Sequence, residues 1–266
     1  MVIPVHDVNP VRRTPWVTYA LIAANIIVFL LTPGAPTTVT GSASAAQVCH
    51  QQEFFDRWAA IPAELVHNRP ATVVPNGQVG QDRQGRIGCV LARPSYHKSP
   101  VLSAFTAMFL HGGWLHLLGN MLFLFIFGNN IEDRFGRFWY LLFYLGCGLV
   151  ATYGFALANR NSTEVLIGAS GAIAGVLGAY LVLFPRTRVW TLVSFIPLPL
   201  PAWAVLGGWF LLQWAYTSGF AVTSAGSVAY LAHVYGFVAG ALVALIVRAV
   251  AGPQDPARPP PRPRYW

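Results

Sequence analysis

Six long apolar runs, separated by polar connections, dominate the hydrophobic pattern of this chain. The runs cover residues 16–31, 114–131, 138–158, 168–184, 202–217 and 228–247. Each is near the length of about 20 residues that a helix needs to cross the apolar core of a bilayer. The pattern therefore predicts an all-α membrane protein, folded as a six-transmembrane-helix bundle over residues 16–250.

The composition agrees with this prediction. Hydrophobic residues make up 55% of the chain and charged residues only 10%, and the mean hydropathy is +0.51. These values exclude an ordinary soluble globular domain. The net charge of +8 is scattered over the connections and the tail, where basic residues typically set membrane topology. We therefore expect the lipid bilayer as a partner, and no nucleic acid.

Three polar segments flank or interrupt the apolar runs. Residues 1–15 are predicted to be a cytoplasmic N-terminal segment, and the first apolar run is interpreted as a retained span rather than a cleaved signal. Residues 32–100 form a long connection rich in Pro, Gly and Ser, which we expect outside the membrane without a separate compact domain. Residues 251–266 are rich in Pro and Arg and are predicted to be a disordered tail.

Arginine is distributed unevenly over the short connections and the termini. If the bundle has six spans, Arg160 is the only arginine in the short outer loops. The inner connections and termini hold the others outside the long loop: Arg12, Arg13, Arg134, Arg137, Arg186, Arg188, Arg248, Arg258, Arg262 and Arg264. This bias predicts that both termini are cytoplasmic. In an oxidising exterior Cys49 and Cys89 can pair, and two free thiols are an equal alternative.

Polar side chains lie near the start of every second span. Ser170, His233, His116 and Asn120 all fall within about two helical turns of the outer ends of spans two, four and six. Strongly polar groups at membrane depth are costly unless they act together or line a wet cavity. The odd-numbered spans offer less, chiefly Asn25 and Gln213.

These four side chains suit acyl-transfer chemistry. Ser170 needs a base to act as a nucleophile, and His233 is the candidate. His116 and Asn120 are four residues apart, so they share a helix face and can donate to one oxyanion. No Asp or Glu lies inside spans four or six, so the sequence predicts a Ser/His dyad. Nothing in the sequence indicates a cofactor or a metal-binding motif.

Structural interpretations compete with each of these roles. Small-residue runs such as Gly171 to Gly175 commonly serve only to pack membrane helices. Asn120 can form an interhelical hydrogen bond without any part in catalysis. His111, beside a glycine pair, is interpreted as an interfacial or structural histidine.

Three motifs in this order resemble the rhomboid intramembrane serine proteases of the prokaryotic type, over most of the chain from about residue 105 to 240. They are His111-Gly-Gly-Trp-Leu-His116-Leu-Leu-Gly-Asn120, Gly168-Ala-Ser170-Gly171 and Ala232-His233-Val-Tyr-Gly236-Phe-Val-Ala-Gly240. The resemblance implies that Ser170 is the nucleophile and that His233 is first the general base and then the general acid. It also implies that His116 and Asn120 stabilise the oxyanion alongside the Ser170 backbone N–H.

The resemblance extends to packing and includes one departure. It implies that Gly236 and Gly240 let span six pack closely against span four. Some members of the family carry an aromatic residue one turn after the serine, which stacks on the histidine, whereas Ala174 occupies that position here. Tyr235 and Tyr180 are the candidates to orient the His233 ring instead.

The combined expectation is a serine endopeptidase that cleaves single-pass membrane proteins at or near the outer face of the bacterial inner membrane. A catalytically silent rhomboid-like protein that binds membrane clients is the first alternative. A transporter or channel that uses the same polar groups is a third hypothesis, which is weakened because no Asp, Glu, Lys or Arg lies inside the predicted spans.

Overall fold

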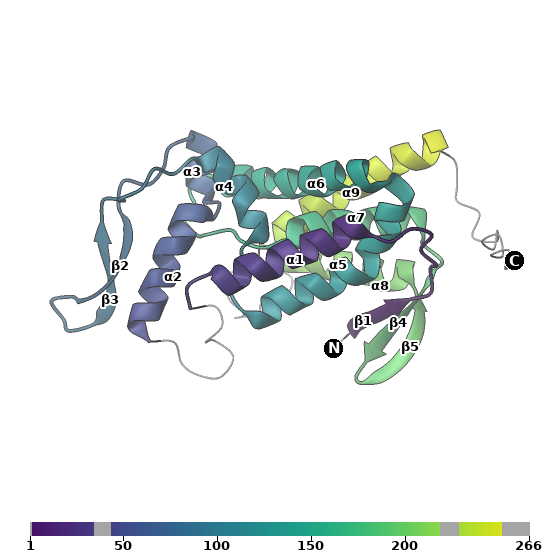
Figure 1. Cartoon of the computed structure of the whole chain (residues 1–266), viewed down its shortest axis with the longest axis horizontal. Helices are drawn as coiled ribbons and strands as arrows, with labels where there is room; N and C mark the ends of the chain where they lie inside the picture. Colours follow the sequence, from purple (N-terminus) through teal and green to yellow (C-terminus); the bar gives the residue numbers. More distant parts are fainter. Residues whose placement is uncertain (1, 35–43, 219–228, 252–266) are drawn as a thin grey trace, which may run out of the picture.

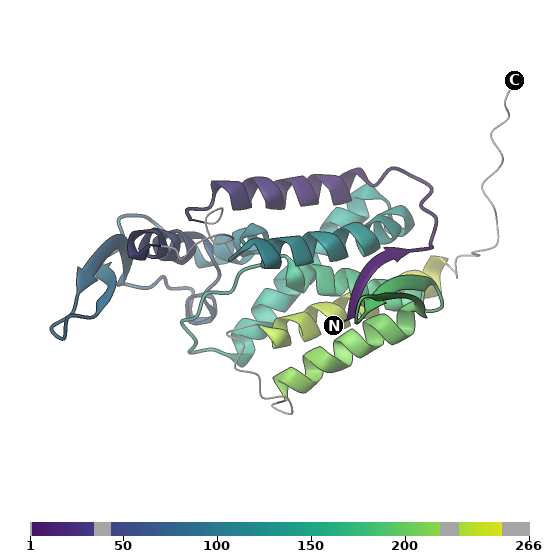
Figure 2. The ribbon, with the colours of Figure 1, turned by 90° about the horizontal axis from the view of Figure 1, so that it is seen from below.

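The computed structural model describes residues 2–34, 44–218 and 229–251. The helices run side by side along the long axis of the molecule, with a small sheet near each end (Figure 1). Figure 2 shows α1 on one flank of the bundle and α8 on the opposite flank. The tail predicted to be disordered lies outside the described residues, except for Ala251 at the end of the last helix.

A helix forms over each predicted apolar run. The six helices are α1 (Trp16–Leu31), α5 (Trp114–Phe135), α6 (Arg137–Ala158), α7 (Ser170–Leu183), α8 (Ala202–Thr217) and α9 (Tyr230–Ala251). Among the described residues, three helices are long and apolar enough to cross a membrane, namely α5, α6 and the Tyr230–Val250 part of α9. Helices α1 and α7 are apolar but shorter. The fold is therefore mostly helical.

The all-α prediction is too narrow, because five strands accompany the helices in the described part of the chain. Strands β1 (Val2–Asp7), β4 (Arg188–Val193) and β5 (Ile196–Pro201) form an antiparallel sheet in the order β1-β4-β5. Prolines at positions 197, 199 and 201 conceal β5 in the sequence, since proline is depleted in strands. Proline is tolerated on an edge strand, however, and β5 is an edge of this sheet.

Residues 44–100 of the long connection also form regular structure, which the sequence did not predict. It contains α2 (Ala45–Trp58), α3 (Pro62–His67) and a hairpin of β2 (Val74–Gln81) and β3 (Ile87–Ala92). A disulfide between Cys49 and Cys89 joins α2 to β3, so the structure favours the paired alternative. A small unit of this kind relies on a crosslink more than on a large core, which leaves little hydrophobic signal in the sequence.

A short helical segment connects the unit formed by α2, α3 and the β2–β3 hairpin to the bundle. Helix α4 (Pro100–Thr106) and a 3-10 turn at Ala107–Phe109 precede α5. The Lys98 ammonium lies 2.6 Å from the Glu64 carboxylate, and both side chains are almost fully buried. Burial lowers the pKa of Lys98, whereas the neighbouring Glu64 carboxylate opposes that shift.

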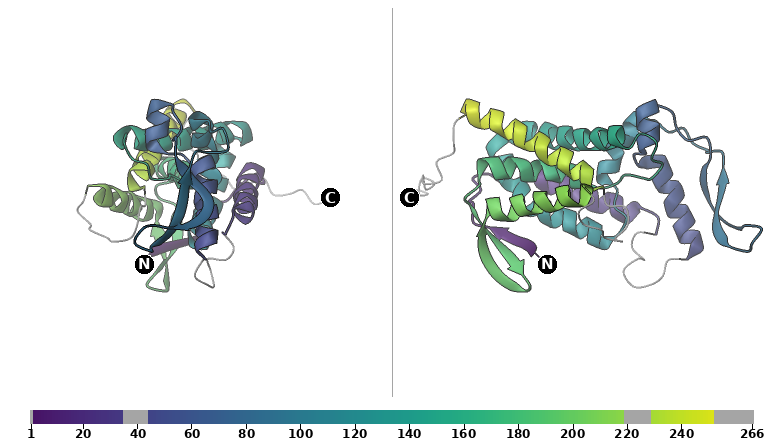
Figure 3. Two further views of the ribbon diagram at one scale, coloured as in Figure 1. Left: turned by 90° about the vertical axis from the view of Figure 1, so that its left-hand side faces the viewer. Right: turned by 180° about the vertical axis from the view of Figure 1, so that it is seen from behind.

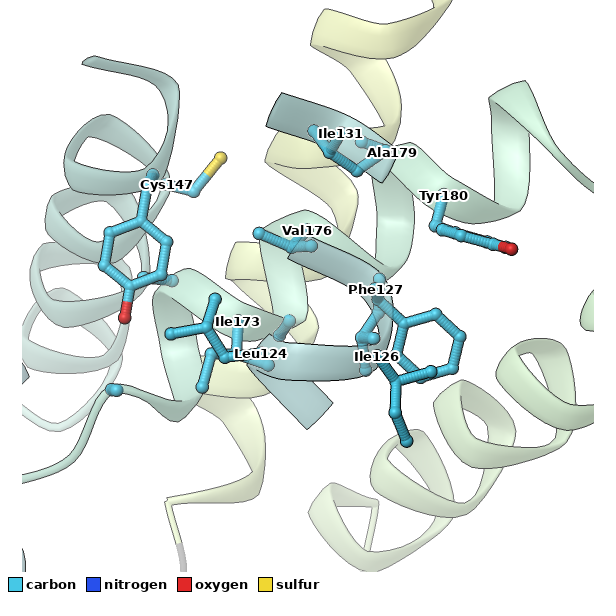
Figure 4. Close-up of a cluster of buried hydrophobic side chains, with 14 of the residues drawn as sticks. Leu124, Ile126, Phe127, Ile131, Cys147, Ile173, Val176, Ala179 and Tyr180 are labelled. Atoms are coloured by element: carbon cyan, nitrogen blue, oxygen red, sulfur yellow. The ribbon is translucent and has the colours of Figure 1, made fainter. Parts of the chain in front are cut away.

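Helix α7 lies in the centre of the bundle. All its residues from Ala172 to Tyr180 are buried, as expected for a helix that is apolar on every side. Figure 4 shows Ile173, Val176 and Tyr180 of this helix among buried side chains of α5 such as Leu124 and Phe127. Packing on all sides fixes the position of Ser170, the first residue of α7.

Glycines bring α7 and α9 into backbone contact. A Cβ atom at Gly236 would collide with the Gly171 carbonyl, and one at Gly240 would collide with the Gly175 carbonyl. Gly178 is equally restricted by the Phe237 carbonyl. The close packing expected of Gly236 and Gly240 is thus confirmed.

A buried polar cluster attaches the three-stranded sheet to the end of α7 remote from Ser170. The Tyr180 hydroxyl donates a hydrogen bond to Asp7 Oδ2 at 2.5 Å, and Asn130 Nδ2 donates to the same oxygen at 2.8 Å. Burial raises the pKa of Asp7, which the hydrogen bond from Tyr180 opposes. Tyr180 therefore anchors β1 and lies far from His233, so it is not the residue that orients the histidine.

Candidate active site

One cavity of about 730 Å³ lies where the N-terminal ends of α5, α7 and α9 meet. Helices α6 and α8 and the segment that precedes α7 complete its wall. Its lining includes all four side chains predicted for the site: Ser170, His233, His116 and Asn120. The structure thus brings together residues that are up to 117 positions apart in the chain, as His116 lies on α5 and His233 on α9.

Ser170 and His233 are in direct hydrogen-bond contact. The Ser170 Oγ lies 2.8 Å from His233 Nε2, and both residues are partly exposed. Ser170 begins α7, so its backbone N–H belongs to the first turn, whose donors have no partner within the helix. A hydroxyl, an imidazole and the backbone donors of a helix N-terminus therefore lie around one point, the set that a search for a nucleophile and its base looks for.

Gln213 on α8 completes this arrangement from the other side of the imidazole. Its Oε1 lies 2.8 Å from His233 Nδ1, and only 7% of Gln213 is exposed. An amide oxygen only accepts hydrogen bonds, so Nδ1 carries the ring proton and Nε2 presents its lone pair to Ser170. The contact selects the tautomer that can accept the serine proton.

Gln213 is one of the few polar residues in the odd-numbered spans, and the sequence pattern alone assigns it no role. Helix α8 runs antiparallel to α7 and α9, so a residue near its C-terminal end reaches the depth at which those helices begin. Gln213 lies one turn before the end of α8 at Thr217. The depth of a residue in the membrane can be counted from the C-terminal end of its span as well as from the start. Counted from the end of α8, Gln213 lies at the same depth as Ser170 and His233.

His116 projects toward the same point from α5. Its Nδ1 lies 3.5 Å from the Gly112 N–H, which donates to it, and this contact leaves the proton on Nε2. A Cβ atom built at Gly168 would lie 2.7 Å from His116 Nε2 and 3.6 Å from Ser170 Oγ. Because residue 168 is glycine, with φ of +121°, the space between the two groups stays open for a reacting oxygen.

Asn120 is held by a histidine. Its Nδ2 lies 3.0 Å from His111 Nε2, and His111 is wholly buried. An amide nitrogen donates, so His111 Nε2 accepts and fixes which edge of the Asn120 amide faces the cavity. His111 is thus a structural histidine, as interpreted from the sequence, and its contact is with the Asn120 amide.

A match to a family model shows the family to which this chain belongs. Residues 98–250, more than half of the chain, match the family model described as "Rhomboid domain". The chain belongs to the rhomboid family. It is an integral membrane protein of a family whose members are typically intramembrane serine proteases.

Several curated rhomboid proteins are similar to this chain. The "Putative rhomboid protease YdcA" of Bacillus subtilis is 37% identical over 103 residues, which are 38% of this chain and 51% of that protein. "RHOMBOID-like protein 1" of Arabidopsis thaliana is 29% identical over 63% of this chain and 39% of its own length. "Rhomboid protein 1, mitochondrial" of Saccharomyces cerevisiae is 30% identical over 53% and 40%. The alignments thus span about two fifths to one half of these relatives.

An aromatic residue on another helix lies beside His233 in this rhomboid protein. Ala174, where some rhomboids carry an aromatic residue, is fully buried. The ring of Trp209 on α8 lies 5.8 Å from the His233 ring between centroids, with 33° between the planes. Tyr235, one of the two tyrosines expected to orient His233, lies against Gly154 instead. Trp209 and Gln213 are one turn apart on α8, so one face of that helix contacts the imidazole on two sides.

Proposed function

We propose that this rhomboid protein is an active intramembrane serine endopeptidase. The observation that carries the proposal is the continuous contact from Ser170 through His233 to Gln213, with 2.8 Å at each step. It is supported by the cavity that opens beside Ser170 and by the family to which the chain belongs.

The proposed reaction has two halves. As Ser170 Oγ attacks the carbonyl carbon of the scissile bond, its proton passes to His233 Nε2. The tetrahedral intermediate collapses when that proton moves to the leaving amide nitrogen, which breaks the C–N bond and leaves an ester on Ser170. Water then attacks the ester and gives a proton to His233. That proton passes to Ser170 Oγ as the ester C–O bond breaks, which releases the acid and regenerates the serine hydroxyl.

The negative oxygen of each intermediate needs donors in place. We infer that His116 Nε2–H, the Ser170 backbone N–H and the free hydrogen of the Asn120 amide supply them. The open space beside Gly168 supports this assignment, because it lies within 3.6 Å of both His116 Nε2 and Ser170 Oγ.

We further infer that α1, α5, α6, α7, α8 and α9 form six spans and that both termini are cytoplasmic. This orientation puts the cavity near the outer face of the membrane, where water can enter. The substrates are then single-pass membrane proteins whose helix unwinds readily near the cleavage point, since an intact helix shelters its peptide bonds.

A fluorophosphonate probe tests the proposal directly. Purified full-length protein in detergent is expected to become labelled on the peptide that contains Ser170, as located by mass spectrometry. Denatured protein is the control, because labelling requires a serine activated by the folded site. Absence of labelling on native protein that is shown to be folded would favour the alternative of a silent, client-binding rhomboid protein. Retention of Ser170 and His233 argues against that alternative.

The proposed orientation predicts which connections are accessible from outside the cell. Cysteines introduced at Arg160, after α6, are expected to react with an impermeant thiol reagent in intact cells. Cysteines introduced at Thr187, before β4, are expected to react only after lysis. The native cysteines are either paired or buried, which keeps the background low. The reverse pattern would contradict the orientation.

Replacing Asn120 by alanine separates oxyanion stabilisation from packing. We expect kcat to fall about 10²-fold or somewhat less, because one donor is lost while others remain. KM should change little, since the hydrogen bond strengthens mainly in the transition state. Turnover of a transmembrane substrate and thermal unfolding in detergent are the measurements.

Asn130→Ala provides the matched control for this prediction. Asn130 is also a buried amide on α5, but its side chain bonds Asp7 at the far end of the bundle. The Asn130→Ala variant should be less stable than the unchanged protein, and its turnover rate per folded molecule should stay the same. If Asn120→Ala behaves in the same way as this control, Asn120 has no role in the oxyanion site.

A further inference from the structure

The hairpin of β4 and β5 carries an apolar tip that no described part of the chain covers. Phe195 is 92% exposed, Ile196 61% and Leu198 40%. Figures 1 and 3 show the hairpin crossing the direction of the helices at the end remote from α2, with its tip leaning back beside the bundle. Its sheet bonds the far end of α7 through Asp7, so it lies at the opposite end of the molecule from Ser170.

The turn at this tip holds a bulky residue in an unfavourable conformation. Ser194 and Phe195 have φ of +48° and +72°, the left-handed values that a two-residue hairpin turn requires. Glycine or asparagine adopts these values at low cost, whereas an aromatic residue rarely does. A strained and exposed phenylalanine is better explained by what it contacts outside the chain than by the turn itself.

The free edge of β5 lacks backbone donors. Along an edge strand every second N–H points away from the neighbouring strand. The β4–β5 ladder is regular from Arg188 and Pro201 to Val193 and Ile196. Prolines occupy every second position, 197, 199 and 201, and have no N–H. The N–H groups that donate to β4 therefore belong to the residues between them, and the prolines take the positions that face outward. The Ala202 N–H, next in that series, indeed donates to the Thr187 carbonyl at 2.8 Å.

A donor-free edge suits a surface of low polarity. An unpaired N–H costs several kcal/mol away from water, and the three prolines remove that cost from the outward edge of β5. Their outward carbonyls still need donors, which water and lipid headgroups supply at the surface of a bilayer. The same edge cannot accept a further strand by regular pairing, because such pairing needs donors from both strands. This feature favours lipid over another protein strand as the neighbour of β5.

The surroundings of the hairpin match the surface region of a bilayer. Trp190 on β4 and Trp203, in the first turn of α8, are both exposed, and tryptophan is enriched at membrane surfaces. Arg186 and Arg188 are exposed at the base of the hairpin, where they can meet lipid phosphates. From Trp203 the exposed apolar surface continues along α8 to Leu211 and Trp214.

We propose that the β4–β5 hairpin is an interfacial membrane anchor. Phe195 and Ile196 insert at the headgroup end of the acyl chains in the leaflet opposite the active site. The arginines at the hairpin base contact lipid phosphates, and the proline edge of β5 lies among the headgroups, where its carbonyls find donors. The anchor rests on the membrane location of this family and not on proteolysis, so labelling of Ser170 can fail while the anchor holds.

Depth-dependent quenching tests the anchor in full-length protein. Cysteine is introduced at Phe195, or at Leu198 in a second variant in case the turn tolerates no change, and is labelled with an environment-sensitive fluorophore. Cys147 is buried and the other two cysteines are paired, so the introduced thiol reacts selectively. Each variant is placed as one copy per nanodisc of phosphatidylethanolamine and phosphatidylglycerol. Lipids brominated at different acyl positions serve as quenchers.

The matched control carries the same fluorophore at Arg83, between the strands of the outer hairpin, which projects away from the bundle (Figure 1). We expect bromolipids to quench position 195 at least twofold, most strongly when bromine is near the headgroup end of the chain, and to leave position 83 unaffected. Iodide in the aqueous phase should quench the fluorophore at position 83 more strongly than the one at position 195. Iodide quenching of 195 and 198 as strong as that of 83, or protection from both quenchers, would overturn the lipid assignment.

Discussion

Substrate cleavage by the Ser170→Ala variant is expected to fall to background, a loss on the order of 10⁴–10⁶-fold, and fluorophosphonate labelling should disappear. His233→Ala should lose nearly as much, because the serine is not activated without its base. The double variant should be no worse than either single one, since the two groups act as a unit. Cleavage of a transmembrane substrate reconstituted with the protein measures all three.

Ser103→Ala is the control for this series. Ser103 is a buried serine whose hydroxyl donates to the Pro100 carbonyl in α4, away from the cavity. This variant should remain fully active, and all variants should show similar thermal unfolding in detergent. Undiminished cleavage by Ser170→Ala would refute the serine-protease mechanism.

The second large effect is expected at Gln213. Replacement by leucine removes the acceptor that holds the proton on His233 Nδ1, so the imidazole can adopt the tautomer with its proton on Nε2. That tautomer cannot accept the serine proton, and loss of the correct tautomer elsewhere reduces kcat by about 10⁴-fold. We expect about 10²–10³-fold here, because Trp209 still contacts the ring and no charge is removed. KM should change little.

Conservative replacement distinguishes orientation from packing. Gln213→Glu keeps an acceptor oxygen at the same distance along the side chain, so it should recover much of the lost rate. Asn25→Leu is the matched control, because Asn25 is a fully buried amide whose Nδ2 donates only locally, to the Leu21 carbonyl in α1. If both replacements at Gln213 are fully active, or if the leucine variant loses only stability as the control does, Gln213 does not position His233.

Two sequence features made much of this protein predictable: the length of the apolar runs and the depth of the polar residues within them. The helices lie where the hydrophobic runs are, because only a helix satisfies the backbone of such a run in lipid. Ser170, His233 and His116 meet because they begin parallel helices at one end of the bundle. Gln213 was not assigned because its depth becomes evident only when α8 is counted from its C-terminal end.

The strands could not be predicted for a different reason. Strand propensities argue against a strand at β5 because it contains prolines. Proline is accepted there only because β5 is an edge strand, which the sequence does not reveal. The role of Tyr180 depends on Asp7, 173 residues earlier in the chain, and no local pattern reports such a contact. Likewise, nothing in the sequence pattern could show that Trp209 rather than Tyr235 lies beside the His233 ring.

The pairing of β1 with β4 has a consequence for the order of folding. Val2 is paired with Val193, so the first strand to be synthesised must wait for most of the chain before its partner exists. Contacts of such long sequence separation form late. At synthesis rates of about 5–20 residues per second, the N-terminal segment would stay unpaired for roughly 10–40 s. Asp7 would then reach Tyr180 only after α7 and β4 have been made.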